Sequence, residues 1–158
     1  MKKVTIYLLI LFALSTMQCS ESIEETPYTY SQMLTGEESK SWRLADLFLI
    51  QDDFESLDYN IFSECFDDDE YVFYNNAQKL YEAKQGARRC FEGDDVYLTD
   101  RWYIVNATAT ISFPLTHLLL LPIELTDINL TIISMSERRM VLEFPYQDLT
   151  FRFILVSN

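Results

Sequence analysis

After residue 40, most of the chain alternates between apolar and polar side chains. This period of two restricts the possible folds more than any other feature of the sequence. Residues 107–113 alternate strictly, with Ala107, Ala109, Ile111 and Phe113 on one face and Thr or Ser on the other. Successive side chains of a β-strand point to opposite faces of a sheet, so the pattern predicts a strand with one buried face. Similar stretches occur at residues 42–50, 71–74, 79–84, 96–98, 102–105, 128–132, 140–144 and 151–155.

Short polar segments separate these stretches and act as turns. Asn75-Asn76 favours a tight reversal because Asn tolerates the left-handed conformation, and residues 92–95, 99–101 and 136–139 have turn composition as well. On the last two strands we expect a core face made of Met140, Leu142, Phe144, Phe151, Phe153 and Leu155. About eight short strands of this kind form a barrel or a sandwich, and we predict an all-β, antiparallel up-and-down barrel.

Two cysteines, Cys65 and Cys90, enclose the aromatic hairpin at residues 71–84. The chain has three cysteines, so one is left over if the others form a disulfide. Pairing Cys65 with Cys90 assigns Cys19 to another role, and a bridge closing this loop is worth roughly 3–4 kcal/mol in the chain-entropy model. The alternative is two buried thiols.

The N-terminal segment predicts export. Two lysines precede an apolar run at residues 4–14, which is too short to span the hydrocarbon core as a helix and is typical of a signal peptide. Cys19 follows this run by five residues and resembles the acylated cysteine of bacterial lipoproteins. This resemblance implies a signal peptide at residues 1–18 and Cys19 as the lipid-modified first residue of the mature chain. An ordinary cleaved signal is the alternative. Residues 19–39 read as a flexible tether containing a short helix near residues 30–34, and residues 40–158 form the domain.

The charge of the chain restricts its partners. The formal net charge is −13, and an acidic surface repels phosphate backbones, so we expect no nucleic-acid partner. The expected membrane contact is the lipid on Cys19. Glu21, Glu24 and Glu25 follow this cysteine and resemble the acidic stretch that directs some lipoproteins outward across the outer membrane. The resemblance implies an outer-membrane lipoprotein, with exposure on the cell surface as the preferred location and the periplasmic face as the alternative.

Residues that carry catalytic or metal chemistry are few. The chain has one histidine, His117, beside the leucine run Leu118–Leu121, and it contains no nucleophile-elbow, zinc-protease or phosphate-loop motif. The acidic run at residues 67–70 could attract calcium, but consecutive side chains of a strand diverge, so a solvated strand end is the favoured interpretation. We expect no enzyme activity, no metal and no cofactor.

Four groups of residues resemble a known family. They are Ser41-Trp42-Arg43-Leu44, Cys65 with Asp67-Asp68 and Tyr71-Val72-Phe73, Cys90 before Trp102, and Met140-Val141-Leu142. Together they resemble the lipocalin-like domain of bacterial lipoproteins. The lipocalin G-x-W opening is absent, since Lys40-Ser41 precedes Trp42, and Asn75-Asn76-Ala77 replaces the usual glycine turn. The resemblance implies a small antiparallel barrel, often anchored by a lipid.

Two functions follow from this interpretation. An eight-stranded barrel can hold one small ligand, and the binding hypothesis places a small apolar molecule among inward-facing side chains. These are Trp42, Phe73, Trp102, Ala109, Ile111, Phe113, Leu130, Leu142 and Phe153. The alternative is a non-enzymatic structural or interaction module of the outer membrane with a solid core. Leu118–Leu121 is either part of the core or an apolar lip for a ligand, a partner or a membrane.

Overall fold

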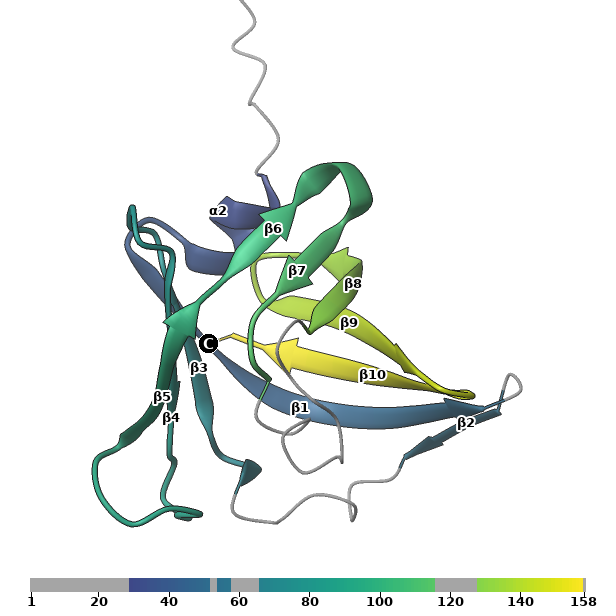
Figure 1. Ribbon diagram of the computed structural model, residues 1–158, viewed down its shortest axis with the longest axis horizontal. Coiled ribbons are helices and arrows are strands. Elements are labelled where there is room, and N and C mark those ends of the chain that lie inside the picture. Colours follow the sequence, from purple (N-terminus) through teal and green to yellow (C-terminus); the bar gives the residue numbers. More distant parts are fainter. Residues whose placement is uncertain (1–28, 52–53, 58–65, 116–127, 158) are drawn as a thin grey trace, which may run out of the picture.

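The computed structural model describes residues 29–51, 54–57, 66–115 and 128–157 (Figure 1). The described residues form the α-helix α2 (Tyr30–Thr35), the 3-10 helix η3 (Asn106–Thr108), and the strands β1 (Ser39–Gln51), β2 (Phe54–Leu57), β3 (Glu70–Tyr74), β4 (Leu80–Lys84), β5 (Val96–Arg101), β6 (Tyr103–Val105), β7 (Thr110–Ser112), β8 (Asn129–Met135), β9 (Arg139–Tyr146) and β10 (Leu149–Val156).

The strands form a nearly closed antiparallel barrel, as the sequence predicted. Its sheet runs in the order β5-β4-β3-β1-β10-β9-β8-β7-β6. Only Trp102 separates β5 from β6, and β5 pairs with β4 whereas β6 pairs with β7. The continuous segment of residues 96–105 therefore leaves one end of the sheet and joins the other (Figure 1). Most strands of the barrel wall lie beside strands that are next to them in sequence, as in an up-and-down barrel, and β2 pairs with β1 outside this order.

Strand β1 connects the two halves of the barrel. Residues 39–42 of β1 pair with β3, and residues 43–50 pair with β10, which completes the circuit between the first and last strands. A shift of register between Leu44 and Asp46 accompanies this change of neighbours. Such a bulge bends a strand and increases its twist, which a small barrel needs in order to close.

The predicted core face of the C-terminal hairpin is confirmed, with one exception. Met140, Leu142, Phe153 and Leu155 are fully buried, and Phe151 is 2% exposed. Phe144 is only partly buried and packs at the edge of this cluster. Most of the large apolar residues at alternate positions of β9 and β10 thus lie in the interior, as the period of two requires, and Val141 between Met140 and Leu142 is buried as well.

The prediction of one strand over residues 107–113 was wrong. Residues 106–108 form η3, Ala109 follows in the left-handed conformation with φ 48°, and the strand β7 begins only at Thr110. Ala107 is exposed, contrary to its predicted core position. The physical reason is that β6 and β7 pair with each other, so the chain must reverse between them. The turn predicted at residues 99–101 was also wrong, because β5 continues to Arg101.

The short helix predicted near residues 30–34 is confirmed, and it packs against the barrel. Thr29 and Gln32 form a capping box at the start of α2, in which each side chain accepts from the other residue's backbone N–H. Leu34 is fully buried, and its carbonyl oxygen accepts a 2.8 Å hydrogen bond from Nε1 of Trp42. The folded part of the chain therefore includes residues 30–39, which we had assigned to the tether.

Candidate functional site

The structure brings nearly all of the predicted ligand-binding residues into one buried cluster. Each of the following is at most 2% exposed: Trp42, Phe73, Trp102, Ile111, Phe113, Leu130, Leu142 and Phe153. Ala109 is different, because it is only partly buried and lies at the end of η3. The alternation therefore identified the inward positions, and the remaining question is whether they surround a space or fill it.

Aromatic rings pack against one another inside the barrel. The ring of Phe73 meets that of Phe113 edge to face, with 4.9 Å between centroids, and Tyr81 lies 5.1 Å from Phe73 and 5.3 Å from Phe113. Such tilted contacts add stabilisation beyond the burial of area. These rings occupy the interior between β3, β4 and the end of β7.

The polar atoms of Tyr81 and Trp102, two buried aromatic residues, are bonded to the protein backbone. The hydroxyl of Tyr81 donates to the carbonyl of Pro114 at 2.9 Å, and Nε1 of Trp102 donates to the carbonyl of Tyr74 at 3.2 Å. Burial raises the pKa of Tyr81 well above its ordinary value, so the phenol stays neutral. These groups hold the core together and leave no donor of their own for a ligand.

A second group of interest lies where the loop before β3 packs against the loop after β4. Asp69 is 2% exposed, and its carboxylate accepts hydrogen bonds from the hydroxyl of Tyr97 and from the N–H of Gly86 at 3.3 Å. Burial raises the pKa of Asp69 to about 6; the two hydrogen bonds oppose this, and Asp67 and Asp68 add to it. The acidic run is therefore more than a solvated strand end.

The neighbouring carboxylates hold the facing loop. Oδ2 of Asp68 accepts from the backbone N–H of Ala87 at 2.8 Å and of Arg88 at 3.2 Å, and Asp67 lies 3.5 Å from the Arg88 guanidinium. A Cβ at Gly86 would lie 2.2 Å from Cγ of Asp68, so only glycine fits this approach. Among the described residues, no three potential ligands converge on a metal ion.

Aromatic residues next to the two predicted bridge cysteines are in contact. Phe66 follows Cys65, Phe91 follows Cys90, and the two ring centroids are 5.9 Å apart. Tyr97 completes the cluster, 5.0 Å from Phe91. Cys65 lies outside the described residues, so the pairing with Cys90 stays a prediction.

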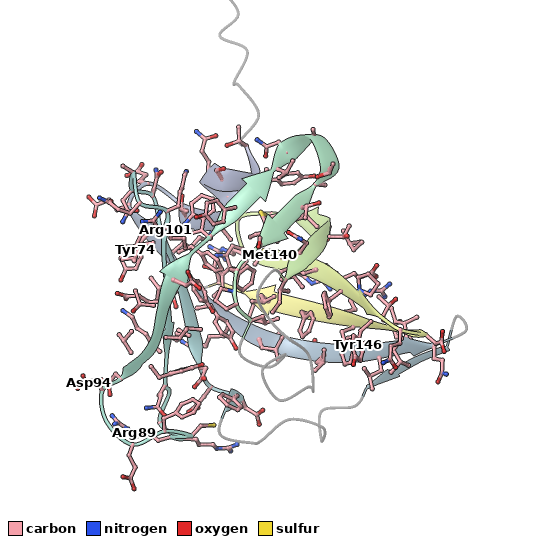
Figure 2. The ribbon with its side chains drawn as sticks, viewed as in Figure 1. Tyr74, Arg89, Asp94, Arg101, Met140 and Tyr146 are labelled. Carbon is pink, nitrogen blue, oxygen red and sulfur yellow. The ribbon has the colours of Figure 1, made fainter. Side chains whose placement is uncertain are left out.

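The third feature is a hollow at the α2 end of the barrel, with a volume of about 470 Å³. Its lining residues come from α2, the segment from α2 into β1, the turn after β3 and the turn between β8 and β9. Arg89 and Asp94 lie in the loop that joins β4 and β5, at the end of the molecule away from α2 (Figure 2). Sequence reasoning missed this hollow, because its lining comes from three separate segments and none of them has a distinctive local pattern.

Several predicted features lie outside the described residues: the signal peptide, Cys19, His117 and the Leu118–Leu121 run. Within the described parts of the chain, no helix is long and apolar enough to cross a membrane. No family model, curated protein or solved structure matches the chain. The lipocalin-like resemblance therefore stays a prediction.

Proposed function

We propose that this chain is an exported, lipid-anchored protein of the outer membrane, and that its barrel is a non-enzymatic structural or interaction module with a solid core. The observation that carries this proposal is the packing of Phe73, Tyr81 and Phe113, whose centroids are 4.9–5.3 Å apart inside the barrel. A carrier of an apolar molecule needs unfilled space at these positions, and a filled interior moves function to the outer surface.

The outer surface offers apolar contact area. Tyr103 and Val105 on β6 are 55% and 53% exposed, and Ile133 on β8 is 51% exposed. These strands flank β7 in the sheet order. Large exposed apolar side chains on two strands of the same part of the sheet suit contact with another protein, whereas single exposed side chains are common on any surface.

The anchor and the disulfide are supported by different observations. Lipidation rests on the apolar run at residues 4–14 and on Cys19 with its acidic neighbours. The Cys65–Cys90 bridge gains support from the contact between Phe66 and Phe91, because each ring belongs to the residue that follows one of the cysteines. Export would place this pair in a compartment where disulfides persist.

A binding experiment separates the solid barrel from a carrier. We expect the purified protein to show no saturable binding of benzene, followed by NMR shifts of the core methyl groups. Leu142→Ala is the positive control, because an engineered apolar cavity takes up benzene and this change removes a fully buried side chain. Val105→Ala, at an exposed position, is the matched negative control. Saturable binding to the unaltered protein would refute the solid-core proposal and favour the apolar-ligand carrier.

A further inference from the structure

The hollow at the α2 end is bordered by a well-ordered hydrogen-bond network. The backbone N–H of Asn75 donates to the carbonyl of Glu38 at 2.7 Å, and its side-chain amide donates to the carbonyl of Glu37 at 3.0 Å. Nζ of Lys40 donates to the carbonyl of Met33 at 3.1 Å and also to the carbonyl of Glu137. These bonds connect α2, β1, the turn after β3 and the β8–β9 hairpin. The lining is therefore held in place before any ligand arrives, which lowers the cost of binding.

Four charged residues line this hollow, two of each sign: Glu37, Lys40, Glu137 and Arg138. The Lys40 ammonium lies 4.8 Å from the ring centroid of Trp42. The pKa of Lys40 is lowered, mainly because the ammonium is partly buried. The negative charge of Glu137 raises this pKa, and the positive charge of Arg138 lowers it further. Two cations thus lie close enough to repel each other in a chain whose net charge is −13.

The other charged side chains of the lining, those of Glu37, Glu137 and Arg138, are exposed and therefore accessible to a ligand in the hollow. The side chains of Glu37, Glu137 and Arg138 make no hydrogen bond or ion pair with any residue in the described ranges. A guanidinium pairs well with the oxygens of a carboxylate or a phosphate, and a carboxylate pairs with an ammonium. An inorganic anion would satisfy the cations alone and would be repelled by Glu37 and Glu137.

We propose that this hollow binds a small zwitterion, one molecule that carries a phosphate or carboxylate group and an ammonium group. Arg138, supported by Lys40, receives the anionic group, and Glu37 and Glu137 receive the ammonium group. The amides of Gln32 and Asn75 line the same space and provide polar contacts for the body of the molecule. The volume of about 470 Å³ lies within the range of small-molecule sites.

Three probes test this site on the purified protein by NMR titration of the backbone amides. Phosphoethanolamine carries both charges, inorganic phosphate carries only the anion, and ethanolamine carries only the cation. We expect saturable shifts of Gly36, Asn75 and Arg138 with phosphoethanolamine, with a dissociation constant of about 1 mM or tighter. Either single-charge probe should bind at least about tenfold more weakly.

A pair of variants locates the contact. Arg138→Gln should weaken phosphoethanolamine binding about tenfold, which corresponds to about 1.4 kcal/mol. Arg139→Gln removes the same charge one residue further along, at an exposed position outside the lining, and should leave binding unchanged. Both changes replace exposed side chains, so both proteins should stay folded. The proposal is overturned by an absence of saturable shifts, by phosphate binding as tightly as phosphoethanolamine, or by equal losses in the two variants.

Discussion

Replacing Asp69 with Asn should stabilise the protein at neutral pH. Asp69 is 2% exposed, and burial raises its pKa from 3.8 to about 6. The folded state therefore prefers a neutral group at this position, whereas the ordinary carboxyl of the unfolded chain is ionised at pH 7. Asn has nearly the same shape and stays neutral, and its amide oxygen can still accept from Tyr97 or Gly86.

The size of the effect follows from the difference between the two pKa values. Each unit of difference corresponds to about 1.36 kcal/mol, so a rise from 3.8 to about 6 costs up to about 3 kcal/mol at pH 7. Because the folded pKa is raised, this cost disappears as the pH falls through 6 towards 3.8. The contribution of Asp69 therefore makes the protein more stable in mild acid than at neutral pH.

Denaturant unfolding at pH 4, 5, 6 and 7 measures this contribution. We expect Asp69→Asn to be about 1–3 kcal/mol more stable than the unaltered protein at pH 7, with the difference shrinking towards zero near pH 4. Comparing the two proteins at each pH removes every contribution that they share. Asp94→Asn, at an exposed position of the same loop region, should show no such trend.

Two results would refute the reasoning about Asp69. One is a variant that is no more stable than the unaltered protein at pH 7. The other is a gain in stability that does not change between pH 4 and pH 7, since a gain of that kind would come from something other than proton binding. The second result would mean that Asp69 keeps an ordinary pKa in the folded state. The first would mean that the hydrogen bond lost in Asn, which has only one amide oxygen for the two donors, outweighs the cost of the buried charge.

Three further changes have expected outcomes. Gln147→Gly should raise the free energy of unfolding by about 0.5–1 kcal/mol, because Gln147 has φ 54° in the two-residue turn between β9 and β10; a loss on denaturant unfolding would contradict this. Cys65→Ser should lower the free energy of unfolding by about 2–5 kcal/mol. Thiol labelling of the unaltered protein without reductant, followed by mass spectrometry, should find no labelled thiol at Cys65 or Cys90. Cys19→Ser should move the domain from the membrane fraction to the soluble fraction, and a variant that stays with salt-washed membranes would place the anchor elsewhere.

Much of the fold could be predicted from local sequence patterns. The alternation at residues 140–144 and 151–155 identified two neighbouring strands and their buried faces, and Asn75-Asn76 marked a hairpin turn. The helix near residue 30 was expected as well. These features depend on residues within a few positions of one another, so their physical causes can be read directly along the chain.

Alternation alone failed at residues 106–109, where the same period of two occurs in a turn. Ala107 and Ala109 are small and bury little area, so nothing holds them to a strand when β6 and β7 must reverse. The left-handed conformation of Ala109 follows from that reversal and not from a local preference. An apolar period made of small residues is therefore weaker evidence for a buried strand than one made of large residues.

The sequence by itself determined the strands, most of the inward faces and the expected route of export. Only the tertiary structure decided that the rings of Phe73, Tyr81 and Phe113 pack against one another inside the barrel. It also decided that Asp69 is buried beside Tyr97, and that charged residues from three segments surround one hollow. The reason is that alternation fixes the face on which a side chain lies, but the fit between side chains depends on strands far apart in the sequence. The burial and the pKa of a charged group likewise depend on which loops pack against it once the barrel has closed.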